Sequence, residues 1–369
     1  MISARFHPYL VGGAEKQALE LSRALSSKGV RVLVITRRWE ASQGDSPSGV
    51  PVLRLPAWGP GPVGSAVFVA AAFFALLLRA RDYDAIHVHL AGSPALAACL
   101  AGRLLKKTVV VKLGGGRGIG EIAESRKTPW GKLKLLLLRH LKPRFTAVSQ
   151  DLLDEAREAG LEGVEYVPNG VDLKRYSPAP PEEKARLRAA LGWPAGLVIL
   201  YAGRLAPEKR LGLALKAFAE ARPSEGDLLV LAGEGGEAGA LAAEASRLGV
   251  ADKVRFLAPV DDIARFYRAA DAFVLPSVSE GLSNALLEAM ACGLAIVASA
   301  VGGTPRAVGA AGLLFKVEDP GGPRSAFERL LREPGLAGRL GALARGAAES
   351  YSLEKTVERY LALYGGERR

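Results

Sequence analysis

Apolar runs of four to seven residues alternate with longer amphipathic stretches along the chain. Continuous apolar runs bounded by turn residues are typical of buried parallel strands, and apolar residues at helical spacing predict helices. We predict strands at Val30–Thr36, Val52–Leu55, Asp84–His89, Val109–Lys112, Val198–Ala202, Leu228–Ala232, Val254–Leu257, Ala272–Leu275 and Ala295–Ala298. Helices are predicted at Glu15–Ser27, Pro94–Leu105, Asp151–Ala159, Ala214–Ala221, Ala238–Leu248, Ile263–Ala269 and Leu353–Tyr364. The alternation predicts an α/β protein with a doubly wound parallel sheet in each half.

A proline-rich segment, Tyr176–Pro181, divides the two series. We predict a Rossmann-like domain over 1–175, a second over 182–350, and a C-terminal helix over 351–369 that packs back toward the first domain. Two such domains would face each other across a cleft, at the carboxyl ends of their strands. Met1–Ala4 has the pattern of a strand end, so the first strand is expected to be truncated, with an upstream start or a fragment as the explanation.

The charge of +11 is concentrated in the first half. Residues 1–180 hold 25 Lys and Arg against 15 Asp and Glu, whereas the remainder holds 24 against 23. A basic half indicates an anionic partner, such as nucleic acid, anionic lipid or a phosphorylated substrate. The two cysteines, Cys99 and Cys292, lie in apolar stretches and are expected to be buried thiols, which suits the cytoplasm. No cleavable signal is recognisable at the N-terminus.

Several common motifs are excluded by their spacing. The glycines of 114–120 do not form G-x-G-x-x-G, and no G-x4-G-K-[ST] occurs. The sequence therefore lacks the main motifs of nicotinamide-dinucleotide-binding proteins and of P-loop proteins. Asp82-Tyr83-Asp84 resembles a metal-binding D-x-D but precedes a strand, and we interpret it as surface. Ser65–Leu78 is apolar for 14 residues, short of the roughly 20 that span a membrane, and is expected to be a core helix.

Residues Arg126–Arg144 combine seven Lys and Arg with Trp130 and a run of leucines. A basic amphipathic helix of this kind can lie on an anionic membrane surface, although a core helix with a solvated basic face is equally compatible with the pattern.

The most informative stretch is Pro276–Met290, which follows a buried strand directly. A small-residue loop, Ser277–Gly281, leads into a helix over Leu282–Met290, whose N-terminus suits a phosphate. Glu280 and Glu288 bracket that terminus, about 12 Å apart along a helix. A carboxylate on each side of an anion site could hold hydroxyls on either side of a diphosphate, although a loop residue and a solvated residue would give the same spacing.

Two cations follow the strand Val198–Ala202. Arg204 and Lys209 lie at its carboxyl end, where Arg offers a bidentate fork and Lys a point charge to a diphosphate. Gly233 and Gly235 repeat this strand-to-glycine pattern after the next strand. Gly12-Gly13 opens the first helix and permits close backbone approach to a ligand.

These motifs occur together in a familiar order: GGAE at 12–15, PNGVD at 168–172, GRLAPEK at 203–209, AGEG at 232–235, SEGLSNALLEAMACGLAIVAS at 279–299 and VGG at 301–303. The set resembles glycosyltransferase family 4 (glycosyl transferases group 1), the retaining sugar-nucleotide enzymes of GT-B fold, over essentially the whole chain. The resemblance implies a hexosyltransferase that moves a sugar with retention, without metal or cofactor, from a UDP- or GDP-sugar. Its acceptor would be glycan, lipid-linked or phosphorylated, in cell-envelope or polysaccharide synthesis at the cytoplasmic membrane face.

The resemblance also assigns residues. Arg204 and Lys209 would hold the donor diphosphate, Glu280 would touch the transferred sugar, and these three form the catalytic set. Glu288 would bind the ribose, and the nucleobase would lie near Leu257–Val260. The implied donor-binding residues are Gly13, Arg204, Lys209, Gly233, Val260, Glu280, Gly281, Ser283, Asn284, Ala285, Leu286 and Glu288.

One departure concerns the acceptor side. Many family members carry a histidine after the strand that matches Val109–Lys112, where this chain has Leu113-Gly114-Gly115-Gly116. His7 could reach the cleft, whereas His87 and His89 lie in a strand. The alternatives are an epimerase or phosphorylase of the same fold, a non-catalytic or truncated nucleotide-sugar-binding protein, and a nucleic-acid binder, for which no recognition motif is present.

Overall fold

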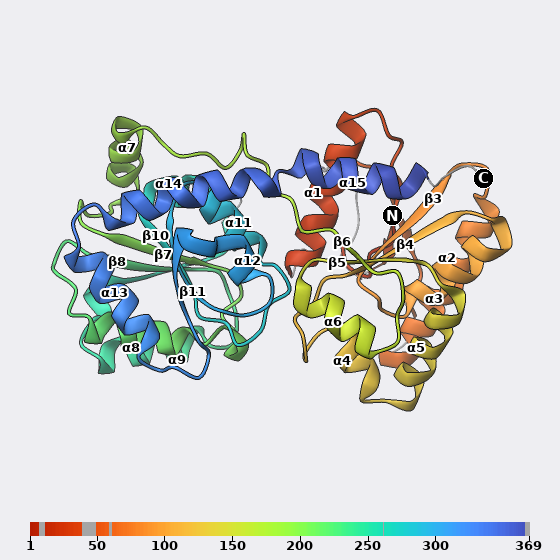
Figure 1. The fold of residues 1–369 in the computed structure, drawn as a ribbon, viewed down its shortest axis with the longest axis horizontal. Helices are drawn as coiled ribbons and strands as arrows, with labels where there is room; N and C mark the ends of the chain where they lie inside the picture. The colour runs from red at the N-terminus through yellow and green to blue at the C-terminus, as the bar shows by residue number, and fades with distance from the viewer. Residues whose placement is uncertain (7–11, 39–48, 59–60, 261, 366–369) are drawn as a thin grey trace. The chain divides into compact units, whose positions relative to one another are not determined.

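The structure is a computed structural model that describes residues 1–6, 12–38, 49–58, 61–260 and 262–365 (Figure 1). Its contacts separate the chain into two compact units. Unit 1 combines Met1–Gly170 with the C-terminal segment from Leu353, and unit 2 comprises Val171–Ser352. The division falls before the proline-rich segment 176–181, because Tyr176 is fully buried in unit 2, where its ring packs edge-on against Tyr267.

Unit 1 is built on parallel strands. Its elements are α1 (Gly13–Ser27), β1 (Val34–Arg37), β2 (Val52–Leu55), α2 (Gly61–Leu78), β3 (Ala85–His89), α3 (Pro94–Leu105), β4 (Thr108–Leu113), α4 (Glu121–Arg126), α5 (Pro129–Leu141), β5 (Arg144–Ala147), α6 (Gln150–Glu158), β6 (Glu165–Tyr166) and α15 (Leu353–Gly365). The ladders are β1-β2 and β3-β4-β5-β6.

Ile2 joins these two ladders. It bridges Ile35 of β1 and Val88 of β3 in parallel, and its N–H donates to the His87 carbonyl at 2.7 Å. Around Ile2 the strand order is therefore β2-β1-Ile2-β3-β4-β5-β6, which is the doubly wound arrangement with Met1–Ser3 in place of the first strand. The strand pattern expected at Met1–Ala4 is thus reduced to a bridge at one residue.

Unit 2 contains a six-stranded parallel sheet in the order β12-β11-β10-β7-β8-β9. Its elements are α7 (Pro181–Leu191), β7 (Val198–Ala202), η1 (Pro207–Lys209), α8 (Leu211–Glu220), β8 (Leu228–Ala232), α9 (Ala238–Arg247), η2 (Ala251–Lys253), β9 (Val254–Leu257), α10 (Ala264–Ala269), β10 (Ala272–Leu275), α11 (Asn284–Ala291), β11 (Ala295–Ser299), α12 (Thr304–Val308), η3 (Gly309–Ala311), β12 (Gly312–Phe315), α13 (Gly322–Arg332), α14 (Leu336–Ala348) and η4 (Glu349–Tyr351). Helices α8, α9 and α13 cover one face, and α7, α10, α11 and α14 the other (Figure 1).

The strands predicted in unit 2 are confirmed within one residue. Every residue of β7, β8, β10 and β11 is buried, which explains their continuous apolar sequences. The strand predicted at Val30–Thr36 begins only at Val34, since Val30 and Val32 pack against the core outside the ladder. The apolar helix α2 is a core helix on one face only: Phe68, Ala72 and Leu76 are buried, whereas Phe74 and Leu78 are exposed. Among the described residues no helix is both long and apolar enough to cross a membrane. Cys99 and Cys292 are free and buried, and burial raises the pKa of each thiol to about 12.

Helix α15 completes the core of unit 1 and carries a polar cluster. Val357 and Tyr360 pack with residues of α1 and β4. His87 stacks on His89 with ring centroids 4.4 Å apart, and its Nδ1 lies 2.5 Å from the Tyr364 hydroxyl in a hydrogen bond. Burial lowers the pKa of both histidines well below the ordinary value, and the nearby Lys112 ammonium lowers them further.

These histidines predict acid sensitivity. Because the folded pKa values lie below those of the unfolded chain, the unfolded state binds the extra protons, and stability falls as the pH drops below about 6.5. We expect a loss of about 1.4 kcal/mol per histidine per pH unit over that window, measured by calorimetry. A double variant, His87→Phe with His89→Phe, should make the profile less steep in this window. A wild-type profile as flat as that of the variant would contradict the assignment.

Candidate active site

The strand order of unit 2 reverses between β7 and β10, which are hydrogen-bonded neighbours. From β7 the chain proceeds outward through β8 to β9, and from β10 outward through β11 to β12. The loops after β7 and β10 therefore diverge at the carboxyl edge of the sheet, and a crevice at such a point is where ligands bind in open α/β sheets. A hydrogen bond from the Val278 N–H to the Glu208 carbonyl, 2.9 Å long, joins the two loops.

The structure brings Lys209 and Glu280 together at this point. The Lys209 Nζ donates to Glu280 Oε1 at 2.6 Å, and the side chains are 17% and 12% exposed. Lys209 ends the short helix η1 after β7, and Glu280 lies in the loop after β10, 71 positions along the chain. A largely buried ion pair costs desolvation, so its presence here is weak evidence for a stabilising role.

Neighbouring loops hold Glu280 in place. The Ser277 hydroxyl donates to Glu280 Oε1 at 2.7 Å, and the Ser299 hydroxyl donates to the Ser277 carbonyl at 2.5 Å. A Cβ at Gly302 would lie 1.9 Å from the Glu280 carbonyl oxygen, and the Gly303 N–H donates to the Gly281 carbonyl at 2.6 Å. The loop after β11 thus packs directly against the loop that carries Glu280.

Arg204 lies in the same loop after β7 as Lys209, but its guanidinium pairs with a different carboxylate. Its guanidinium pairs with Glu208 at 2.7 Å and is 54% exposed, and its carbonyl accepts the Tyr201 hydroxyl at 2.7 Å. The two predicted cations therefore differ in exposure and in partner. Lys209 is largely buried and paired with Glu280, whereas Arg204 is exposed and paired with Glu208.

Helix α11 begins at Asn284, two residues later than predicted, because Ser283 is its N-cap. The Ser283 hydroxyl accepts the Leu286 N–H at 3.3 Å, while Ala285 is half-buried in the first turn. Gly281 is buried before the cap.

Glu288 is only 3% exposed, so the solvated alternative for this residue is wrong. Burial raises the pKa of Tyr267 well above its ordinary value, and the neighbouring Glu288 carboxylate adds to that effect.

Gly233 and Val260 lie farther along the same edge. Gly233 has φ of 143°, and a Cβ there would lie 1.9 Å from the Gly203 carbonyl oxygen, so only glycine lets these two loops touch. The Gly233 N–H donates to the Leu257 carbonyl at 2.9 Å. Val260 follows β9 and is half-buried.

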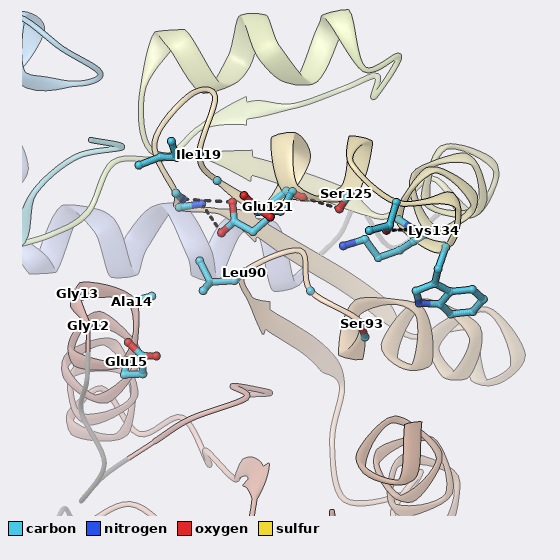
Figure 2. Close-up of a pocket in the computed structure, with 18 residues that line it drawn as sticks. Gly12, Gly13, Ala14, Glu15, Leu90, Ser93, Ile119, Glu121, Ser125 and Lys134 are labelled. Carbon is cyan, nitrogen blue, oxygen red and sulfur yellow. Dashed lines mark hydrogen bonds between the residues drawn. The ribbon is translucent and has the colours of Figure 1, made fainter. Parts of the chain in front are cut away.

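Unit 1 has a pocket of its own, about 570 Å³, at the carboxyl ends of β3 and β4 (Figure 2). Gly12, Gly13 and Glu15 at the start of α1 line one side, and the loop 114–120 with α4 and α5 lines the other. Figure 2 shows Glu121 and Lys134 in this pocket, with the Lys134 side chain extending toward Glu121.

The sequence reasoning missed both of these charged residues. Glu121 accepts the N–H groups of Gly114 and Gly115 at 3.4 and 3.3 Å, and Lys134 donates to the Ala91 carbonyl at 2.8 Å. Burial raises the pKa of Glu121 and lowers that of Lys134. The signal for Glu121 was its place directly after the glycine loop. Lys134 was hidden among the seven cations of Arg126–Arg144.

A third buried charge, Lys112, lies on β4. Its ammonium donates to the Asn169 side chain at 2.7 Å, and burial lowers its pKa to about 7. No histidine lines the described pocket, and His7 lies outside the described residues. His87 and His89 are buried within the core. Among the described residues no group of His, Cys, Asp and Glu could hold a metal ion.

Two doubly wound α/β units, each with its ligand edge at the carboxyl ends of parallel strands, define a protein of GT-B fold. In accord with this, HepE of Anabaena in complex with UDP and glucose superposes with a TM-score of 0.79 at 21% identity, covering 98% of this chain and 97% of that one. WaaG, a glycosyltransferase involved in lipopolysaccharide biosynthesis, gives 0.78 at 19% identity and 99% coverage of both chains.

Sequence comparison names the family. Residues 11–175 match the model of Glycosyltransferase Family 4, and residues 196–333 match that of Glycosyl transferases group 1. A D-inositol 3-phosphate glycosyltransferase of Frankia alni is 33% identical over 396 residues, covering 96% of this chain and 94% of the relative. The chain belongs to glycosyltransferase family 4, as its motifs predicted, and is a glycosyltransferase.

The contact at Gly302 predicts a large effect from one methyl group. Gly302→Ala places a Cβ against a backbone oxygen at φ of 55°, so we expect a loss of about 3 kcal/mol or more in the free energy of unfolding. Gly192→Ala is the matched control, because Gly192 has φ of 64° and ψ of 32°, in the left-handed region, with nothing within 4 Å of the added atom. It should cost only about 1 to 2 kcal/mol. Equal losses in denaturant titrations would show that the contact with the Glu280 loop is unimportant.

Proposed function

We propose that the chain is a retaining glycosyltransferase that moves a sugar from a nucleotide-diphosphate sugar to a glycan, lipid-linked or phosphorylated acceptor in cell-envelope or polysaccharide synthesis. The observation that carries the proposal is the Lys209–Glu280 pair at the strand reversal of unit 2. Support comes from HepE, which binds UDP and glucose, from WaaG, which acts in lipopolysaccharide biosynthesis, and from the relatives named for D-inositol 3-phosphate.

In this proposal Lys209 and Arg204 stabilise the negative charge that develops on the departing diphosphate. Fixed cations at a partly dry site do this without reorganisation at the moment of reaction. The α11 N-terminus, with Ser283, Asn284, Ala285 and Leu286, adds its partial positive charge next to the phosphates. Because these charges are protein groups, the reaction is proposed to need neither a metal ion nor a cofactor.

Glu280 contacts the transferred sugar and Glu288 the ribose hydroxyls, while Gly233, Val260 and Gly281 shape the remainder of the donor site. Gly13 is assigned to the donor by the family resemblance alone. Retention follows if the acceptor attacks from the face that the diphosphate leaves, with a phosphate oxygen taking the proton.

The alternative is a non-catalytic nucleotide-sugar-binding protein of the same fold. Such a protein would bind a nucleotide sugar but would not release the nucleotide, whichever acceptor is added.

The donor assignment is tested by thermal unfolding with UDP, GDP and ADP, with and without magnesium. A nucleotide at about 100 times its dissociation constant should add roughly 2.7 kcal/mol of stability. Lys209→Ala should remove most of this gain and lower turnover by roughly 100-fold or more, because a diphosphate cation is lost. Lys216→Ala is the matched control: Lys216 is an exposed lysine of the same unit, 3.8 Å from Glu220. Unchanged nucleotide stabilisation in Lys209→Ala would exclude the proposed site.

We also propose that the protein works in the cytoplasm at the membrane surface through Arg126–Arg144. Of 14 large apolar side chains exposed in the described residues, 11 lie in unit 1. On α5 these are Trp130, Leu133, Leu136 and Leu137, interspersed with the exposed cations Lys132 and Arg139. Apolar side chains with neighbouring cations suit the boundary of an anionic leaflet. Lys134 does not belong to this surface, since it is buried.

The membrane proposal predicts salt-sensitive sedimentation with vesicles that contain anionic lipid, and little with zwitterionic vesicles. Leu133→Gln with Leu136→Gln should release most of the bound protein. Leu343→Gln, which changes an exposed leucine of unit 2, should not. Failure of the wild type to sediment at low salt would end this part of the proposal.

A further inference from the structure

The pocket of unit 1 carries a charge opposite to that of the sequence around it. Its described lining includes three carboxylates, Glu15, Glu121 and Glu124, and one ammonium, Lys134. Most basic residues of the first half do not line this cavity, although Lys134 does and the buried Lys112 interacts electrostatically with Glu121. At about 570 Å³ it has the size of a small-ligand site.

The carboxylate of Glu121 is fixed rather than mobile. The two N–H groups that it accepts, from Gly114 and Gly115, leave further lone pairs on each oxygen. The glycine loop permits this arrangement, since a Cβ at Gly115 would lie 2.6 Å from the Gly120 Cα. Glu121 therefore presents an acceptor of hydrogen bonds in a set position.

Lys134 supplies the complementary donor. It is 7% exposed and uses one N–H on the Ala91 carbonyl, so an ammonium with three donors retains capacity for a ligand. Figure 2 shows the Glu121 and Lys134 side chains lining the same pocket, with Glu15 on α1. Sugar hydroxyls both donate and accept, and so can satisfy both groups at once.

A phosphate monoester fits this pocket poorly. Two negative charges would face Glu121 and Glu15 in a partly desolvated space, with Lys134 as the compensating charge among the described lining residues. Burial of like charges without pairing is costly. Glu124, by contrast, is paired with Lys127 at the exposed rim and contributes less to this field.

We infer that the unit 1 pocket selects an uncharged sugar end of the acceptor, bound through hydroxyls on Glu121 and Lys134, and excludes a phosphate at that position. The inference rests on the proposed function and narrows its acceptor class to an unphosphorylated glycan terminus, which would set this chain apart from the relatives named for D-inositol 3-phosphate. Glu121 is the specificity-determining residue, because its carboxylate accepts hydrogen bonds from sugar hydroxyls and repels a phosphate of the same charge.

The test compares matched probes on the full chain: the methyl glycosides of glucose, mannose and galactose, and the 6-phosphate of each. Binding is measured by ligand-observed NMR at about pH 8. In the wild type at least one neutral probe should bind more tightly than its phosphate. Glu121→Gln keeps the side-chain shape and removes the charge, so it should shift the neutral-to-phosphate ratio roughly tenfold toward the phosphate.

Glu124→Gln is the matched control and should leave the ratio unchanged, because that carboxylate is paired at the rim. A wild-type preference for a phosphorylated probe, a ratio insensitive to Glu121→Gln, or no binding of any probe would each overturn the inference. Nucleotide stabilisation measured on the same sample reports on the proposed function separately. Loss of that stabilisation with an intact probe ratio would reject the donor site alone, and the reverse would reject the pocket assignment alone.

Discussion

The contact between the Lys209 ammonium and the Glu280 carboxylate joins the two loops at the strand reversal of unit 2. Sheet hydrogen bonding ends with β7 and β10, so beyond those strands the loops are positioned by their own contacts. The ion pair, the Ser277 hydroxyl and the Val278–Glu208 backbone bond supply them. The pair also neutralises each charge locally, in keeping with a second half of the chain that has almost no net charge.

Close backbone approach is the second constraint on this edge. Gly233 against Gly203, Gly235 against Leu205 and Gly302 against Glu280 each leave no space for a side chain. These glycines let successive loops nest at the carboxyl ends of adjacent strands, so that backbone groups rather than side chains form much of the surface. Such a surface can approach a diphosphate closely, because no Cβ stands in the way.

Unit 1 separates two kinds of charge. Its exterior is basic and carries most of the exposed apolar side chains, whereas its pocket holds Glu121 and Glu15 against one lysine. These surfaces meet at α5, where Trp130 both lines the pocket and is 59% exposed. The exterior and the pocket of unit 1 therefore suit ligands of different chemistry, which the net charge alone does not reveal.

Most strands, the fold class and the family followed from the sequence by itself, because buried parallel strands need continuous apolar runs and glycine motifs need fixed places beside them. The partly buried strand β12, Gly312–Phe315, was not predicted. The pairing of Lys209 with Glu280 did not follow, since 71 positions separate them and only the strand reversal makes them neighbours. Burial of Glu288 and Lys134 was equally hidden: a charged residue at helical spacing has the same pattern whether it faces water or the interior. The tertiary structure decided which charges meet, because side-chain direction across layers depends on packing between distant elements.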